Sequence, residues 1–417
     1  MGYRRTFWFN AGMSAYWFST SYKWFILLFI LIPDKVKDIV PGGEKNAAWG
    51  MILGTGAVWA LFGPAIFGRI YERASGPFRK RWPWIAIGAG LTSVAVLAAY
   101  GANSLVAIGA AYFLLQLSDD IGTGPYAGMV ADSVPENSRG YASSVMGGFK
   151  LAGQIVSAVA AIALSKIFPG RIDLIFYVIA AINVAGGLWT AWTVRDLPEA
   201  DREPRESSFV HDYIEPFKSF DFRAVWINRF IVFFANGCVT AYALYFLRDL
   251  VPTYHLFGKD LGDEKSAANV LALTISFTGI LGSVVAAHYA DKIGRKPLMV
   301  WSIVALAVFL APVAFLRDYQ WIWAAVALYG VGNGIFQATD WAIGSDVLPN
   351  PERAATQMGA WQSSETSVQI FVGLLMGPLI TELNKVSMGL GYQAMVGIAC
   401  VLFLLSLPSI RAIKGAR

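Results

Sequence analysis

Several ionisable residues lie within segments that are otherwise apolar, and these residues carry the chemistry that could serve a function. Asp119 and Asp120 are adjacent carboxylates, Lys150 lies in the next apolar segment, and Glu365 lies in a later one. Charged side chains at membrane depth are costly and are functional candidates by default. Two neighbouring carboxylates at low dielectric favour binding of a proton. We therefore expect these four residues to couple a proton or another cation, the alternative being a purely structural ion pair.

The depth of these charges follows from the rise of a helix. Asp120 lies 12 residues before Asp132, which places it ~18 Å from the end of its segment, and Lys150 lies ~16 Å into the following one. A pair between Lys150 and an aspartate is thus expected. Asp119 lies ~100° around the helix from Asp120, so at most one of them faces a cavity directly. Glu365 lies at a similar depth in the other half of the chain, either as part of a relay or as a separately satisfied charge.

A repeated motif divides the chain into halves. Asp132-Ser-Val-Pro-Glu-Asn-Ser-Arg139 and Asp346-Val-Leu-Pro-Asn-Pro-Glu-Arg353 carry Asp, Pro and Arg at the same offsets, 214 residues apart in a chain of 417. Each copy directly follows a long apolar segment, which the proline is expected to end. A half-length repeat in a hydrophobic chain predicts two homologous membrane bundles with a binding site between them, as in many secondary transporters.

The composition indicates a protein built for lipid. Hydrophobic residues make up 56% of the chain and charged residues 15%, whereas a soluble domain has roughly a quarter charged residues. We expect an all-α fold, a polytopic membrane protein with twelve transmembrane helices in two pseudo-symmetric six-helix bundles. The segments of spanning length lie at about 6–32, 46–71, 82–101, 104–131, 141–166, 172–194, 224–250, 266–290, 297–316, 319–347, 357–382 and 389–409. The first segment is expected to be a retained helix, because no small-residue cleavage site follows it.

The positions of Lys and Arg predict the orientation and the domains. With the N-terminus inside, twenty of the 33 Lys and Arg residues lie on the inner side and ten on the outer side, so both termini should be cytoplasmic. Residues 1–195 should form the first bundle, 196–223 a cytoplasmic linker and 224–417 the second bundle. Phe209, Tyr213 and Phe217 recur at helical spacing in that linker. They indicate either a short helix on the membrane surface or an ordinary charged linker.

Two inner loops combine an acid at a helix end with a tight basic turn. Asp291-Lys-Ile-Gly294-Arg295-Lys forms one, and Glu72-Arg73 followed by Arg79-Lys-Arg forms the other. Such groups can clamp neighbouring helix ends through charge-assisted hydrogen bonds and release them in another conformation. Positive-inside topology alone explains the basic residues but not the acids. We therefore predict a cytoplasmic gate.

The loop that follows span eight resembles the signature of the major facilitator superfamily, Gly-x-x-x-Asp-(Arg/Lys)-x-Gly-(Arg/Lys)-(Arg/Lys), except that Ala287 replaces the first Gly. The copy at Glu72 has Glu for Asp and an insertion. That copy and the run from Gly124-Pro125 to Asp132 are similar to the glycoside-pentoside-hexuronide:cation symporters and the sucrose-transporter-like branch. The resemblance covers all twelve spans and implies one inner charge network, the candidate gate, made by Glu72, Arg73, Asp132, Arg139, Asp291, Arg295, Asp346 and Arg353.

The resemblance also implies that spans one, four, seven and ten line a cavity. Aromatic, amide and charged side chains on these spans could hold a sugar. The candidate substrate-binding residues are Lys23, Tyr16, Gln116, Asn236, Tyr242, Asn333, Gln337, Asp340 and Trp341. Lys23 either extends to the outer interface or faces the cavity, whereas Arg229 is assigned to the inner interface.

The sequence thus predicts a secondary active transporter that works by alternating access, with proton-coupled symport of a sugar-like polar solute. The alternatives are an exporter or uniporter of amphiphilic or anionic solutes and a non-transporting membrane solute sensor. We expect no enzyme activity, no cofactor and no metal site, because the three histidines are scattered and both cysteines lie in apolar segments. The expected partners are a small solute, a proton or other cation and the lipid bilayer, with no nucleic acid. We further expect a monomer in the plasma membrane.

Overall fold

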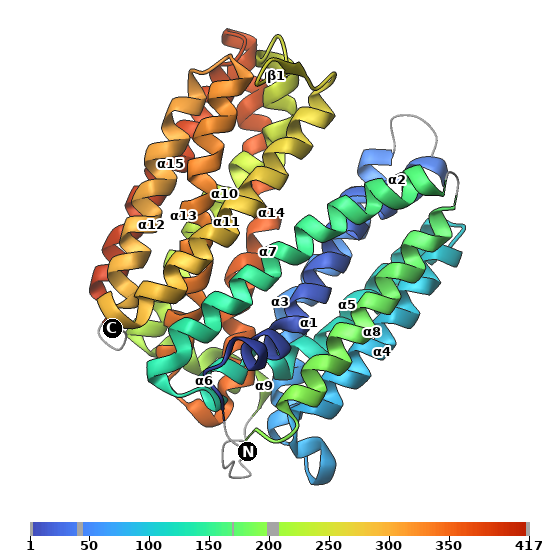
Figure 1. Ribbon diagram of the computed structural model, residues 1–417, viewed down its shortest axis with the longest axis vertical. Coiled ribbons are helices and arrows are strands. Elements are labelled where there is room, and N and C mark those ends of the chain that lie inside the picture. Colours follow the sequence, from blue (N-terminus) through green and yellow to red (C-terminus); the bar gives the residue numbers. More distant parts are fainter. Residues whose placement is uncertain (1–2, 40–44, 169–170, 198–207, 414–417) are drawn as a thin grey trace. The chain divides into compact units, whose positions relative to one another are not determined.

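The chain is described by a computed structural model that covers residues 3–39, 45–168, 171–197 and 208–413 (Figure 1). All twelve predicted spans are helical in it. Seven of the described helices are long and apolar enough to cross a membrane by length and composition alone. The described chain departs from an all-helical structure at one place, a two-residue hairpin between spans seven and eight.

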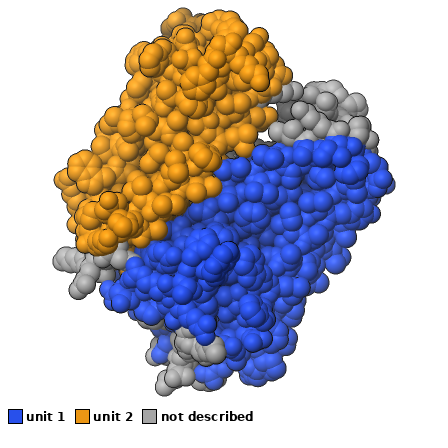
Figure 2. Space-filling model, in the orientation of Figure 1, with its two compact units in different colours: residues 1–219, 348–363 blue, residues 220–347, 364–417 orange. Residues whose placement is uncertain are grey.

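The chain packs as two compact units, coloured separately in Figure 2. Unit 1 contains residues 1–219 together with 348–363, and unit 2 contains 220–347 together with 364–417. Unit 1 therefore includes a segment from the second half of the sequence. This segment is the loop after span ten and the start of span eleven.

Unit 1 holds the first six spans and the connecting linker helix. In chain order its α-helices are α1 Phe7–Ile26, α2 Ile32–Ile39, α3 Lys45–Glu72, α4 Arg81–Gly101, α5 Leu105–Ala127, α6 Met129–Ser133, α7 Glu136–Ile167, α8 Ile172–Val194 and α9 Phe209–Ile214. A π-helical turn at Leu27–Leu31 joins α1 to α2, and 3-10 turns form at Gly76–Arg79, Glu215–Lys218 and Pro351–Arg353. Side chains cap several of these helices: the Thr6 hydroxyl accepts from the N–H of Phe9, and the Ser104 hydroxyl from that of Ala107.

Small residues allow the helices of unit 1 to approach closely. Helix α1 packs on α7 and α8, and α4 packs on α5 and α8. The Thr190 hydroxyl of α8 donates to the carbonyl of Gly12 at 2.7 Å and accepts from the N–H of Tyr16 at 2.9 Å. Hydrogen bonds between spans from such residues are typical of membrane bundles, where lipid gives no hydrophobic driving force between helices. These contacts fix α1, which carries the first buried charge of the candidate site.

Span four is broken near its inner end, the end that the loop charges predict to lie on the cytoplasmic side. Helix α5 ends at Ala127, Gly128 follows it, and the short α6 continues to Ser133. The guanidinium of Arg81 donates to the carbonyl of Pro125 at 2.8 Å. The break therefore lies closer to the inner end of the span than Asp120, and a buried arginine satisfies a carbonyl beside it.

Unit 2 holds spans seven to twelve. Its helices are α10 Phe220–Leu250, α11 Glu264–Ile293, α12 Arg295–Leu310, α13 Tyr319–Asp346, α14 Ala354–Val386 and α15 Leu390–Ala412, with a 3-10 turn at Ala311–Ala314. Helix α13 packs on α11 and α12, and α15 packs on α10 and α12. Helix α14 begins in unit 1 and continues into unit 2 at residue 364.

The hairpin of unit 2 pairs β1 His255–Leu256 with β2 Lys259–Asp260 in antiparallel register. Its turn residues, Phe257 and Gly258, have φ values of 50° and 78°. Two positive φ values in a two-residue turn match the twist of the strands that it joins.

Candidate functional site

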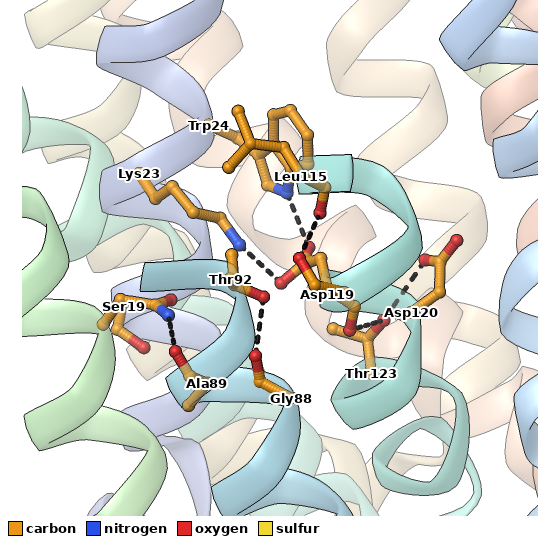
Figure 3. A network of polar contacts seen from close by, with 12 residues as sticks. Ser19, Lys23, Trp24, Gly88, Ala89, Thr92, Leu115, Asp119, Asp120 and Thr123 are labelled. Carbon is orange, nitrogen blue, oxygen red and sulfur yellow. Dashed lines mark hydrogen bonds and ion pairs between the residues drawn. The ribbon is translucent and has the colours of Figure 1, made fainter. Parts of the chain in front are cut away.

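The first buried charge cluster joins spans one and four of unit 1. The Lys23 ammonium forms an ion pair with the carboxylate of Asp119, and the side chains expose 0% and 6% of their areas. The Trp24 indole donates to the other carboxylate oxygen at 2.7 Å. Figure 3 shows Asp119 pointing toward both partners. Lys23 therefore does not extend to the outer interface, and a cation one span away neutralises Asp119.

Asp120 points away from this pair, toward Thr123 (Figure 3). The Asp120 side chain is buried, and the Thr123 hydroxyl lies 3.5 Å from its Oδ1 atom. The indole of Trp59 lies beside its Oδ2 atom, which accepts no well-aligned hydrogen bond from the described residues. A buried carboxylate with so little compensation is costly in its charged form and is most stable with a proton. The two aspartates thus differ in their surroundings: Asp119 is paired with Lys23, whereas Asp120 lies beside Thr123 and Trp59.

The second buried cluster joins spans seven, ten and eleven of unit 2. The Arg229 guanidinium forms ion pairs with Asp340 and with Glu365. The side chains of Arg229 and Asp340 expose 2% and 1% of their areas, whereas Glu365 exposes 35%. The assignment of Arg229 to the inner interface was wrong, because the structure buries it among these acids. The exposed part of Glu365 leaves it accessible to a solute or to a proton.

The two clusters place their charges on corresponding spans of the two units. In each unit the cation lies on the first span, α1 or α10, and an acid lies on the fourth, α5 or α13. The residues are not equivalent at the 214-residue offset, which places Asn333 opposite Asp119. The repeat in the sequence therefore does not reveal the pairing, because each half satisfies it at different turns of its helices.

The structure gives Asp119 a different partner from the one that the sequence suggested. The sequence favours pairing of Lys150 with an aspartate of span four, whereas the cation bound to Asp119 is Lys23. The Lys150 ammonium lies 5.9 Å from the ring centre of Trp17, a cation–π distance. Glu365 likewise binds Arg229 within its own unit.

The remaining substrate candidates are buried or half-buried in their units. The Tyr16 ring packs against Tyr126, with ring centres 5.5 Å apart. Gln116 lies 3.5 Å from the Tyr112 hydroxyl, and Asn236 accepts a hydrogen bond from Tyr329. The others, Tyr242, Asn333, Gln337 and Trp341, are half-buried.

The inner ends of both units contain one repeated ion pair. The Arg81 guanidinium binds Asp132 with two hydrogen bonds, of 3.0 and 2.5 Å. At the 214-residue offset, Arg295 pairs with Asp346. All four side chains are buried, at 7% exposure or less. Each pair joins the start of a unit's third span to the end of its fourth. The gate candidates Asp132, Arg295 and Asp346, together with Arg81, therefore brace the bundle within a unit.

A second set of inner contacts binds the segment 348–363 to the rest of unit 1. The Glu72 carboxylate accepts from the Thr356 N–H at 2.9 Å and from its hydroxyl at 2.5 Å. Glycines allow this segment to approach: a Cβ atom at Gly68 would lie 2.6 Å from the backbone of Ala355. Glu72 therefore holds the first turn of α14, where the free N–H groups of a helix favour an anion.

Asp212 of the linker helix α9 is the centre of the same inner network. It is buried at 3% exposure and binds Arg353, Arg69 at 2.7 Å and Arg73 at 3.6 Å. Glu215 accepts from Arg353 at 2.8 Å. The linker is thus a docked helix rather than an ordinary charged connection, and Tyr213 also anchors it through the carbonyl of Leu61.

Two further gate candidates complete the set. Arg139 donates to the carbonyl of Ala131 at 2.6 Å and to that of Val134 at 3.3 Å, so it caps the end of span four. The side chain of Asp291 lies outside the described part of the chain.

Several residues of these networks are not among the candidates predicted from the sequence. Arg81 could have been found, because it lies at the 214-residue offset from Arg295. Asp212 and Thr356 carry no signal, since one lies in a polar linker and the other in an ordinary helix turn. Trp24 follows Lys23 and Arg229 follows Asn228 in otherwise apolar segments, and only packing assigns them partners.

The comparison with known families identifies the class of protein. The family model described as Major Facilitator Superfamily matches residues 50–373. The chain therefore belongs to the major facilitator superfamily, and it is an integral membrane transporter rather than an enzyme. This confirms the resemblance, the fold and the absence of enzyme activity predicted from the sequence.

A curated relative and several solved structures extend this comparison. A probable plastidic glucose transporter 2 from Arabidopsis thaliana is 31% identical over 135 residues, 30% of this chain and 27% of that protein. The human organic anion transporter MFSD10 (TETRAN) has a TM-score of 0.74 at 14% identity, over 98% of this chain and 99% of its own. The proton:xylose symporter XylE has a TM-score of 0.71 at 13% identity, over 99% and 97%. An outward-facing bacterial homologue of the iron transporter ferroportin has a TM-score of 0.72 at 12% identity, over 98% and 99%. These structures share the fold.

Proposed function

We propose that this transporter carries a neutral, sugar-like polar solute together with a proton, by alternating access. The observation that carries the proposal is Asp120, a buried carboxylate that points away from the Lys23–Asp119 pair and has little hydrogen-bond compensation. Protonation removes its charge from the low-dielectric interior, and release of the proton becomes favourable when water enters. Asp119 is paired with Lys23, and this pair would keep the site ordered through that cycle.

The charges of the clusters favour a neutral solute over an anion. Arg229 faces two acids in unit 2, so its cluster has a formal charge of −1 when all three groups are ionised. Lys23 is likewise paired. A cation that is already neutralised offers little net attraction to an anionic solute. Neutral sugars are held by amides, carboxylates and aromatic rings instead, and the candidates Gln116, Asn333 and Trp341 offer such groups.

The glucose transporter and the xylose symporter among the similar proteins support this choice, and the organic anion transporter supports the alternative, an exporter or uniporter of anionic solutes. In the proposed cycle the gate closes when Glu72 and Asp212 contact residues 348–363, and it opens when these contacts break. We further propose that the protein acts as a monomer in the plasma membrane with both termini in the cytoplasm.

The test uses purified protein in proteoliposomes with an imposed pH gradient. Uptake of labelled glucose, xylose, a disaccharide and an organic anion is measured for the native protein, Asp120→Asn and the control Asp173→Asn, which alters the Arg171–Asp173 ion pair at the start of α8. We expect accumulation of a sugar that collapses with the gradient. Asp120→Asn should lose accumulation but keep exchange of labelled for unlabelled sugar.

Gradient-driven accumulation that survives in Asp120→Asn would refute the role of this residue in coupling. Uptake of the anion with no uptake of any sugar would favour the alternative. Specific sugar binding without any flux would indicate a solute sensor.

A further inference from the structure

Span two carries a tryptophan and a glycine, one helical turn apart, on the side that meets Asp120. Trp59 and Gly63 both lie on helix α3, which packs on α5. A Cβ atom at Gly63 would overlap the Oδ2 atom of Asp120 and would lie 2.7 Å from the Nε1 atom of Trp59. The indole nitrogen and the carboxyl oxygen are therefore neighbours above the glycine. Asp120 occupies space that exists only because residue 63 has no side chain.

The Trp59 nitrogen and the Asp120 oxygen are complementary groups whose geometry falls short of a well-aligned hydrogen bond. Both atoms are buried, and neither has a well-aligned partner among the described residues. The indole N–H only donates, and Oδ2 accepts when the carboxyl is charged. A buried donor and a buried acceptor are costly when they stay unpaired, and this cost is removed when they bond to each other. The two groups are therefore placed to form one further hydrogen bond.

The backbone turn beside these groups lacks one of its helical hydrogen bonds. Pro64 follows Gly63 inside α3, and a proline has no N–H to donate, so the carbonyl of Ala60 receives no helical hydrogen bond from it. Long helices kink at such positions. On the facing helix, a Cβ atom at Gly124 would lie 2.6 Å from the carbonyl oxygen of Pro64. The turn that carries Trp59 is thus packed closely on α5 and yet is able to deform.

Two rings hold the indole of Trp59 without bonding its nitrogen. Its ring centre lies 6.4 Å from that of Phe67 on the same helix and 5.8 Å from that of Phe113 on α5, both in edge-to-face geometry. Such contacts orient an aromatic ring and leave its polar group to find a partner. The ring is therefore kept beside α5, where the carboxyl of Asp120 lies.

The other titratable groups near Asp120 lie on α1 and α5. Lys23 and Asp119 act on it electrostatically, and Tyr16 is the third neighbour. Lys23 is paired with Asp119, so its charge is shared with a closer carboxylate. A neutral donor such as the Trp59 indole is therefore the group on α3 that is placed to compensate the charge of Asp120.

We propose that Trp59 is a positioning residue for the coupling proton: its indole N–H donates to the Asp120 carboxylate once the proton has left, and Gly63 provides the space for this contact. The inference rests on the proposed role of Asp120 in coupling. The O–H bond of the carboxyl breaks, the proton passes to water that enters the site, and the indole keeps its own hydrogen. The new hydrogen bond compensates a charge that is otherwise costly in the interior.

The first test is infrared difference spectroscopy of the purified protein in lipid, between acidic and alkaline pH. The carboxyl and carboxylate bands of Asp120 are those that Asp120→Asn removes. Trp59→Phe keeps an aromatic ring but removes the N–H, so we expect the carboxylate band of Asp120 to shift. Trp323→Phe is the control, because it removes an indole hydrogen bond to Thr274 in unit 2. It should leave the band in place.

The second test compares two transport rates in proteoliposomes. Trp59→Phe should slow gradient-driven accumulation of labelled sugar about tenfold, the factor that one hydrogen bond to a charged group is worth. Exchange of labelled for unlabelled sugar should continue, because it needs no proton release. Gly63→Ala should separate the same two rates. Gly90→Ala, where a Cβ atom would meet nothing within 4 Å, should change neither.

The outcomes separate this inference from the proposed function. A carboxylate band that Trp59→Phe leaves unchanged would overturn the inference while coupling through Asp120 stands. Equal loss of accumulation and exchange in Trp59→Phe would show that the ring only supports packing, and this result would also overturn it. If Asp120→Asn removes no band, the proposed coupling itself fails and the inference fails with it. Should Gly63→Ala fold poorly, the spectrum of Trp59→Phe still decides.

Discussion

Lys23 and Asp119 form an ion pair between the first and fourth spans of unit 1, and neither side chain exposes more than 6% of its area. Removing one partner of a buried pair leaves an uncompensated charge, whereas replacing both is often tolerated. Stability measurements can therefore separate this pair from its neighbour Asp120, whose Oδ2 atom has no hydrogen-bond partner among the described residues.

Asp119→Asn should lower the free energy of unfolding by about 3–5 kcal/mol, because Lys23 then remains buried and charged. The double variant Lys23→Met/Asp119→Leu should recover most of that loss. Thermal unfolding in detergent measures both, with Asp173→Asn as the control at an exposed pair that should unfold like the native protein. An Asp119→Asn variant as stable as the native protein would show that the pair does not form in solution.

The two acids that bind Arg229 should differ in their contributions to stability. Asp340 is fully buried, whereas Glu365 keeps 35% of its side-chain area exposed. Asp340→Asn should cost about 3 kcal/mol or more, and Glu365→Gln should cost clearly less, because solvent screens the exposed acid. Chemical denaturation of the two variants, matched in charge change, tests this order. The reverse order would mean that Glu365 is the principal partner of Arg229.

The repeated inner pairs should respond equally to the same substitution. Arg81 binds Asp132 through two nitrogens, and a lysine cannot form that bidentate contact. Arg81→Lys and Arg295→Lys should each lower stability by about 1.5–3 kcal/mol, the value of a hydrogen bond to a charged group. The measurement is the shift in unfolding midpoint. A change in one variant only would show that the two pairs, although they lie at equivalent positions, contribute differently to stability.

Gly68 should be intolerant of a methyl group. A Cβ atom there would lie 2.6 Å from the backbone of Ala355, whereas one at Gly109 would meet nothing within 4 Å. Gly68→Ala should displace the first turn of α14, cost about 1–3 kcal/mol and slow transport. Gly109→Ala should keep native transport and stability. Parallel uptake and unfolding assays of the two variants compare the same chemical change at a closed and an open position.

The sequence predicts the helices and the family well, because length, apolar composition and loop charge determine them. Predicted and observed spans agree within a few residues for α4 and α8, for example. It predicts the site less well. Asp119 and Asp120 are recognisable as buried acids, but nothing in the sequence shows that Lys23 neutralises one and not the other. That distinction depends on which face of α5 meets α1, and helix rotation is set by packing across the whole unit.

The candidate gate residues are also only partly predictable from the sequence. Arg353 and Glu72 are recognisable from the repeated motif and from the loop signature. Their partners Asp212 and Thr356 come from segments with no distinctive pattern, and tertiary contacts alone bring them together.

Because residues 348–363 belong to unit 1, the protein cannot be divided at its central linker into two polypeptides that each contain a whole unit. A cut at the central linker would give a first fragment that lacks the segment bound by Glu72 and Asp212. Those acids would face solvent without Thr356 and Arg353. Co-expression of the complementary fragment would have to supply that segment before the first could complete its native contacts, so the folding of one fragment should depend on the presence of the other.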